Sequence, residues 1–104
     1  DWRRSSMTTS ALTESAAADL YKATPDGDPR RFLDFLIDHP GEQLWSEAIQ
    51  QELGFAEHRQ IALAAWAIGQ EATRLGLARP WNEAQRGYSM SEASANLLAA
   101  ARER

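Results

Sequence analysis

The stretch AEHRQIALAAWAIGQEATRLGLARPWNEAQRGYSM, residues 56–90, decides how the rest of the chain is interpreted. In its first part, apolar side chains recur at the spacing of one helix face, and Gly76 ends that pattern. Beyond Gly76 the helical spacing is lost, and Pro80 and Gly87 disfavour a helix. We therefore predict a long helix over 56–75, followed by a two-stranded β-hairpin.

The predicted helix over 56–75 has an apolar face and a mixed face. At about 100° per residue, the residues that turn toward the core are Ile61, Ala64, Ala65, Ile68, Ala72 and Leu75. The residues on the opposite face are Arg59, Leu63, Trp66, Gln70, Thr73 and Arg74. Exposed apolar side chains as large as Leu63 and Trp66 usually find a cover. We therefore expect the N-terminal helix (residues 14–23), a second subunit or a protein partner to cover them.

The hairpin is expected to contain an edge strand, a polar loop and a returning strand, which cover residues 77–81, 82–87 and 88–90. Pro80 suits an edge strand because it has no N–H to donate to a neighbouring strand. Trp81 and Tyr88 are expected to form a cross-strand aromatic pair. This pair would close the hairpin onto the body of the protein.

Two further helices and a short apolar step precede the long helix. Asp28 and Ser46 are typical N-cap residues, and Gly54 is typical of a helix C-terminus. The elements predicted here are a helix over 29–38, a brief strand over 44–45 and a helix over 47–53. We expect the side chain of Trp45 to lie in the core.

Each end of the domain is expected to carry one more helix. Thr13 and Ser91 are suitable N-caps, and the predicted helices cover 15–23 and 92–102. Residues 1–10 are polar and lack any period, which predicts a disordered tail. Residues 11–104 then form a single domain, mainly α-helical, with about five helices and one β-hairpin between the long helix and the last one.

The composition excludes several classes of protein. A chain of 104 residues with 43% hydrophobic residues can bury one modest core. There is no cysteine, so disulfides and cysteine-based zinc sites are excluded, and a reducing compartment fits. No apolar run approaches the roughly 20 residues that a membrane span needs. We expect a cytoplasmic protein without a membrane partner.

The net charge of −4 argues against strong nonspecific binding of nucleic acid, because domains that depend on phosphate contacts are usually basic. The charge is unevenly distributed. Residues 1–56 contain ten acidic and five basic residues, whereas residues 57–90 contain four arginines and three glutamates. The slight positive excess therefore falls on the long helix and the hairpin.

No catalytic site can be recognised in the sequence. The two histidines, His39 and His58, lack further ligands at metal-binding spacing. The serines near residue 90 have no paired base, and no glycine-rich phosphate loop is present. We expect no enzyme, no catalytic residue, no metal and no cofactor.

Four stretches resemble the winged helix-turn-helix family. "RRFLDFLIDHPGEQL" (30–44) resembles a first helix that leads into a short strand, and "WSEAIQQELGF" (45–55) a second helix with its Leu-Gly turn. "EHRQIALAAWAIGQEATRLGL" (57–77) resembles a lengthened recognition helix, and "ARPWNEAQRGYSM" (78–90) resembles a wing. The resemblance covers about residues 28–100 and extends to small uncharacterised bacterial proteins of this fold. It implies a winged helix-turn-helix with an extra N-terminal helix.

The resemblance implies binding of duplex DNA, because that is the commoner use of this fold. The long helix would enter the major groove and the wing would lie on the backbone or in the minor groove. Arginine and glutamine suit base edges, and arginine also suits phosphates. The candidate DNA-binding residues are His58, Arg59, Gln60, Gln70, Thr73, Arg74, Arg79 and Arg86. On this hypothesis the protein is a homodimeric bacterial transcription regulator.

The alternative hypothesis is a protein-interaction winged helix that binds no nucleic acid. Leu63 and Trp66 lie on the outward face of the long helix, among the residues that would read bases, and would form its contact patch. The surface charge distinguishes the two hypotheses. A continuous positive strip over the long helix and the wing favours DNA, and an apolar patch among acidic residues favours a protein partner.

Overall fold

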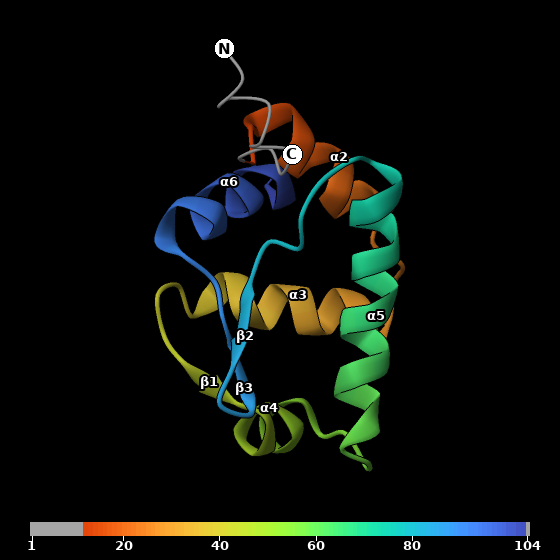
Figure 1. Ribbon diagram of the computed structural model, residues 1–104, viewed down its shortest axis with the longest axis vertical. Helices are drawn as coiled ribbons and strands as arrows, with labels where there is room; N and C mark the ends of the chain where they lie inside the picture. Colours follow the sequence, from red (N-terminus) through yellow and green to blue (C-terminus); the bar gives the residue numbers. More distant parts are fainter. Residues whose placement is uncertain (1–11, 104) are drawn as a thin grey trace, which may run out of the picture.

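The computed structural model describes residues 12–103. The tail expected over residues 1–10 lies outside this range. The described chain is mainly helical, with a small antiparallel sheet (Figure 1). No helix within this range combines the length and the apolar character needed to cross a lipid bilayer.

The chain alternates helices with short strands. In order, the elements are α2 (Glu14–Ala23), α3 (Asp28–Asp38), β1 (Leu44–Trp45), α4 (Ser46–Leu53), α5 (Arg59–Arg74), β2 (Asn82–Ala84), β3 (Gly87–Ser89) and α6 (Glu92–Arg102). In Figure 1, α3 crosses the middle and α5 runs along one side. The helices α2 and α6 lie together at one end, and α4 lies at the other end.

The helix ends agree closely with the predicted ones, with small corrections. Thr13 and Ser91 cap α2 and α6 through their side chains, as predicted, and Gly54 ends α4 with a φ of 70°. The caps predicted at Asp28 and Ser46 are wrong by one residue, because these residues are the first of α3 and α4.

The helix predicted to begin at Ala56 begins later, at Arg59. A turn precedes it, in which the backbone N–H of Glu57 donates a hydrogen bond to Oε1 of Gln60 at 2.8 Å. This side-chain bond satisfies an N–H that the first helical turn would leave without a partner. The helix α5 is therefore shorter than the apolar pattern indicates.

The hairpin exists, but its strands are displaced from the predicted positions. The strand predicted over 77–81 is wrong, since β2 occupies the first half of the segment expected to be a polar loop. The strand predicted over 88–90 is displaced by one residue from β3. The true loop consists of Gln85 and Arg86, with φ of 50° and 61°. Two residues in the left-handed region form the tight turn that favours antiparallel pairing.

The sheet has three strands in the order β1-β3-β2, all antiparallel. Trp45 of β1 pairs with Gly87 of β3, and Ala84 of β2 pairs with the same glycine from the other side. Neighbouring residues of a strand face opposite sides, so β1 buries Leu44 and turns Trp45 outward. The core position expected for Trp45 is wrong, because its side chain is 48% exposed.

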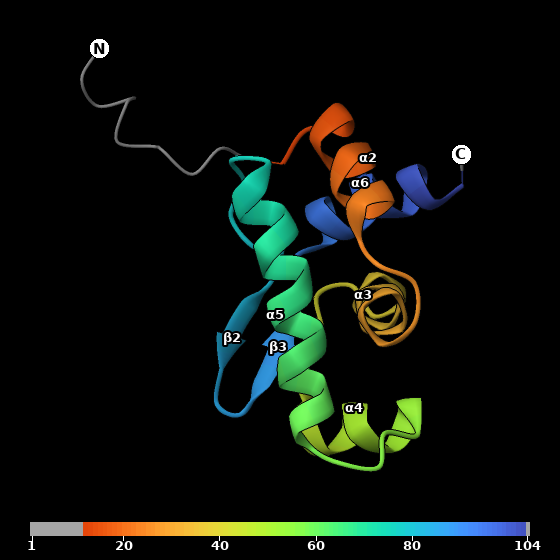
Figure 2. The ribbon, with the colours of Figure 1, turned by 90° about the vertical axis from the view of Figure 1, so that its right-hand side faces the viewer.

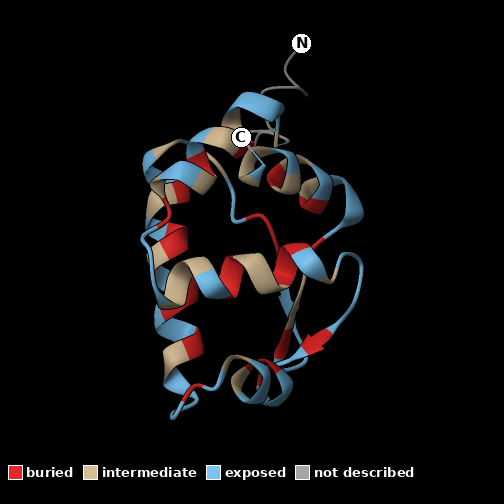
Figure 3. Ribbon diagram, turned by 180° about the vertical axis from the view of Figure 1, so that it is seen from behind, coloured by how far each residue is buried: buried red, intermediate tan, exposed pale blue. Residues whose placement is uncertain are grey.

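The core forms around α3, whose buried residues come in two adjacent pairs about one helical turn apart (Figure 3). The core face of α5 is confirmed, with Leu75 only half-buried. Phe32 of α3 makes edge-to-face contacts with Trp81 at 5.5 Å and Tyr88 at 5.1 Å between ring centroids. Trp81 and Tyr88 also contact each other at 6.3 Å. These rings attach the hairpin to α3, as the sequence predicts, although Trp81 lies just before β2.

Candidate interaction surface on α5 and the hairpin

The outward side of α5 carries two large apolar side chains. Leu63 and Trp66 are each 57% exposed, one helical turn apart. Figure 2 faces this side of the molecule, with α5 nearest the viewer and the hairpin beside it. We call this side the α5 outer face, and its residues are Arg59, Leu63, Trp66, Gln70, Thr73 and Arg74, all of them exposed. The face predicted from helical spacing is therefore correct.

An ion pair lies at each end of the α5 outer face. Nε of Arg59 is 3.0 Å from Oε1 of Glu57. At the other end, Nε of Arg74 donates to Oε1 of Glu71 at 3.0 Å. Such exposed pairs contribute only about 0–1 kcal/mol to stability. They do, however, place a carboxylate beside each arginine and so weaken the positive potential of the helix.

Arg79 is not part of the α5 outer face. Its side chain instead contacts both α5 and the hairpin. Its guanidinium lies against the backbone of α5 at Gly69, where a Cβ would come within 2.6 Å of Nε. Nη1 of Arg79 donates to Oε2 of Glu83 at 3.1 Å, and the indole N–H of Trp81 donates to the same oxygen at 2.9 Å. The arginine is thus held by a carboxylate of β2.

Two further predicted residues lie at the start of α5. His58 is exposed and precedes the helix. Gln60 is half-buried, and both ends of its amide are used: Oε1 accepts from Glu57, and Nε2 donates to Oδ2 of Asp28 at 3.3 Å. Gln60 therefore holds α5 against α3, and its amide is not free for base edges.

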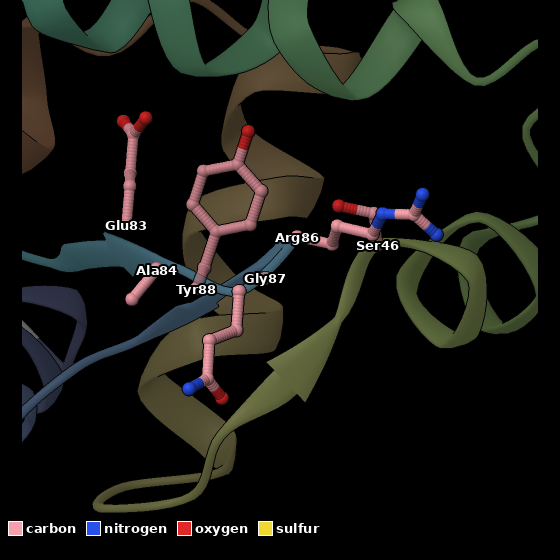
Figure 4. Close-up of a pocket in the computed structure, with 7 residues that line it drawn as sticks. Ser46, Glu83, Ala84, Arg86, Gly87 and Tyr88 are labelled. Atoms are coloured by element: carbon pink, nitrogen blue, oxygen red, sulfur yellow. The ribbon is translucent and has the colours of Figure 1, made fainter.

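A cleft of about 270 Å³ lies along the hairpin (Figure 4). Glu83 and Tyr88 are partners across the hairpin and point to the same side, toward α5 in Figure 4. Burial raises the pKa of the Tyr88 phenol, and the nearby Glu83 carboxylate raises it further, against an opposing effect of Arg79. The phenol therefore stays neutral at physiological pH and can donate a hydrogen bond.

Arg86 lies at the tip of the hairpin, next to the start of α4. Its backbone carbonyl accepts a hydrogen bond from the N–H of Ser46 at 2.9 Å, and both residues line the cleft. Its side chain is exposed. Within residues 12–103, it has no carboxylate partner at ion-pair distance. Of the four candidate arginines on α5 and the hairpin, it is the one without such a partner.

The structure thus brings the predicted residues together only in part. Arg59, Gln70, Thr73 and Arg74 share one helix face, whereas Arg79 lies at the junction with the hairpin and Arg86 at its tip. No continuous positive strip connects them, because glutamates pair with three of the four arginines. The pair of Glu71 and Arg74 has a signal in the sequence, since residues three apart on a helix are neighbours.

Among the described residues, no group of three histidine or acidic side chains is arranged to hold a metal ion. Comparisons of the chain with protein-family models, with curated proteins and with solved structures gave no match. The assignment of a function therefore depends on the surface itself.

Proposed function

We propose that this protein is a winged helix-turn-helix interaction module that binds another protein surface through the α5 outer face, and that a second copy of the chain occupies it. The family assignment is supported by the order α3, β1, α4, α5, β2, β3 and by the strand order β1-β3-β2. The proposed contact rests on one observation. Leu63 and Trp66 are exposed side by side at the centre of a face whose ends are neutral ion pairs.

This arrangement is typical of protein interfaces. Their centres are poor in charge and rich in aromatic residues, and their rims are polar. A tryptophan near the centre of such a patch often carries much of the binding energy. The α5 outer face has this composition, with Trp66 at its centre and Arg59 and Arg74 toward its ends.

The face is also complementary to itself. In a two-fold symmetric dimer the same patch contacts its own copy, and Arg59 and Thr73 are equally far from Trp66 in sequence. Two α5 helices that cross antiparallel at Trp66 would place the Glu57–Arg59 pair of one copy near the Glu71–Arg74 pair of the other. Each pair offers both signs of charge, so these ends attract rather than repel.

The expected association is weak. Covering the exposed parts of Leu63 and Trp66 contributes roughly 2–3 kcal/mol per copy. Two copies give about 5 kcal/mol before the loss of translational and rotational freedom is subtracted, so the contact of these two side chains alone supports a dissociation constant no tighter than on the order of 0.1–1 mM. Measurements must therefore reach this range of concentration.

Sedimentation velocity over a series of concentrations tests the proposal. We expect the wild-type protein to dimerise and Trp66→Gln to remain monomeric with an unchanged circular dichroism spectrum. Trp45→Gln is the matched control, since it removes a tryptophan of similar exposure on β1 and should dimerise like the wild type. A wild-type chain that stays monomeric at about 1 mM, or a Trp66→Gln chain that still dimerises, would refute the proposed contact.

The second candidate function is binding of duplex DNA through α5 and the wing, and Arg86 favours it. A long side chain in the left-handed region costs about 1–2 kcal/mol compared with glycine, and such strain often marks a functional position. The tip of a wing is also where a cation would meet the phosphate backbone. Because both functions need the α5 outer face, a dimer formed there would exclude DNA.

Fluorescence anisotropy with random duplex DNA at low salt tests this second function. Binding would weaken steeply as salt is added, with a smaller salt dependence for Arg86→Gln, because one phosphate contact is lost. Absence of binding at low salt would exclude the DNA function and leave the protein contact.

A further inference from the structure

A second cavity, of about 430 Å³, lies between α2, α3 and α6, at the end of the molecule away from α4. Its volume falls within the range of small-molecule sites, roughly 300–1,000 Å³. Six residues line it: Ala18, Tyr21, Lys22, Arg30, Ala101 and Arg102. Three of them are cations and none is acidic.

Arg30 is held rigidly at this cavity with unused hydrogen-bonding capacity. Its guanidinium stacks on the ring of Tyr21, with Cζ 4.5 Å from the centroid, and Nη2 donates to the carbonyl of Thr24 at 2.7 Å. Its Nε is buried and has no acceptor among the described residues. The nearest carboxylate, that of Asp26, is 3.6 Å away and 95% exposed, so solvent screens that pair strongly.

Arg102 enters the cavity from α6 and is positioned by α3. Nη2 donates to Oδ1 of Asp38 at 3.0 Å, and Nη1 donates to Oδ1 of Asp34 at 3.4 Å. Asp34 also accepts a hydrogen bond from the hydroxyl of Tyr21 at 2.9 Å. Neither carboxylate lines the cavity. The two aspartates fix the arginine and the tyrosine. They also weaken the positive charge of Arg102, so Lys22 and Arg30 supply most of the positive charge at the cavity.

Part of the lining of the cavity is apolar. Ala18 and Ala101 present methyl groups from the two terminal helices, and Tyr21 presents an aromatic ring. A ligand that fits this surface has an apolar or aromatic body and a negatively charged group. Paired N–H donors of arginine suit a carboxylate or a phosphate.

We propose that the cavity between α2, α3 and α6 binds a small organic anion whose carboxylate or phosphate is held by Arg30, Arg102 and Lys22. The body of the ligand packs against Tyr21, Ala18 and Ala101. This site is separate from α5 and does not depend on the proposed function of that helix.

Titration of the isotope-labelled protein by NMR tests the site, with benzoate, phenyl phosphate and inorganic phosphate as probes. Sodium chloride at matched ionic strength is the control for screening. We expect saturable shifts of the Nε–H signal of Arg30 and of the amide signals of Ala18 and Ala101. The ratio of the affinities for benzoate and phenyl phosphate distinguishes a carboxylate ligand from a phosphate ligand, and inorganic phosphate shows how much the aromatic body adds.

Two variants affect the cavity in different ways. Arg30→Gln removes a cation, and Ala18→Phe fills the space without changing the charge. Each should weaken binding at least tenfold. Arg31→Gln is the matched control, because Arg31 is the next residue of α3 but pairs with Asp28 and lies over Phe55. It should bind like the wild type.

Lys22→Gln is a third variant that serves if Arg30→Gln or Ala18→Phe folds poorly. It changes an exposed side chain and should also weaken binding of the anion. Shifts that do not saturate, or that chloride reproduces, would overturn the proposal. Full affinity in the Ala18→Phe variant would overturn it as well.

Discussion

At the scale of single residues, Gly87 and Gly69 both lack room for a Cβ, but the groups that leave no room are different. A Cβ on Gly87 would come within 2.5 Å of the backbone carbonyl oxygen of Leu44 and within 2.6 Å of Nε2 of Gln43. A Cβ on Gly69 would instead meet the guanidinium of Arg79, the far end of a flexible side chain. Only a Cβ on Gly87 would keep two paired strands from approaching each other, because the oxygen that it meets belongs to the backbone of β1.

We therefore predict that Gly87→Ala lowers the free energy of unfolding by about 1–3 kcal/mol, as overpacking does. Gly69→Ala should change it by less than about 1 kcal/mol. The gain in helix propensity, about 1 kcal/mol, is offset by loss of the partly exposed Arg79–Glu83 contact, worth about 0–1 kcal/mol. Urea unfolding followed by tryptophan fluorescence measures both. Equal effects of the two substitutions would contradict this difference in contacts.

Helical spacing alone predicts which side chains of α5 are exposed, and the prediction is right for Leu63 and Trp66. It cannot predict that Arg79 lies over Gly69, since that contact depends on how the segment after α5 returns along the helix. The carboxylate partner of Arg74 was within reach of the sequence, because Glu71 lies three residues away on the same helix. Arg79 and Glu83 do not share a helix, so their spacing alone does not predict their contact. How the carboxylate partners of the arginines change the surface charge can be seen only in the folded structure.

At the scale of elements, the hairpin between β2 and β3 has a turn whose residues do not suit its backbone. Gln85 and Arg86 both have positive φ, whereas Asn-Gly is the preferred pair for such a turn. We predict that the double change Gln85→Asn and Arg86→Gly raises the free energy of unfolding by about 1 kcal/mol. Thermal unfolding followed by circular dichroism measures this. A less stable variant would show that the side chain of Arg86 stabilises the hairpin.

The positions of β2 and β3 could not be predicted from composition. Pro80 is compatible with an edge strand over 77–81, but this segment carries the buried Pro80 and Trp81 and leads the chain from α5 to the sheet. Strands of three residues are defined by their partners more than by their own propensity. Here the partner of β2 is β3, which in turn pairs with β1, far away in the sequence. The longer, capped helices did not depend on such contacts, and their predicted bounds are nearly correct.

At the scale of the whole molecule, the two tyrosines report on different regions. Burial raises the pKa of Tyr21, and the hydrogen bond to Asp34 raises it further. Burial likewise raises the pKa of Tyr88 in the hairpin. Since Tyr21 and Tyr88 are the two tyrosines of the chain, its tyrosinate absorbance arises from these two regions alone.

We predict that the protein loses stability at alkaline pH. Above the ordinary tyrosine pKa of 10.0, the unfolded chain releases the phenolic protons while the folded chain still binds them. The free energy of unfolding therefore does not change through these groups below that pH, and it falls as the pH rises through the raised values. Absorbance titration of the native protein and urea unfolding at several alkaline pH values check this. Phenols that are half-ionised below pH 10.0 in the folded protein would contradict the shift.

The cavity between α2, α3 and α6 illustrates what sequence reasoning could not reach in this chain. Its lining comes from residues 18–30 and from residues 101 and 102, which are far apart in sequence. No spacing rule brings Arg30 and Arg102 together, and each of them alone is an ordinary surface cation. Only the packing of the first described helix against the last one creates the site.

That packing also determines how the molecule would respond to mechanical load. The helices α2 and α6 lie side by side at one end of the molecule (Figure 1), tied to α3 through Asp34, which both Tyr21 and Arg102 contact. A pull on the two ends of the described chain would first act on these helices and separate them. The sheet and α4 lie away from the line of force, so they would stay folded until the terminal helices had been drawn apart.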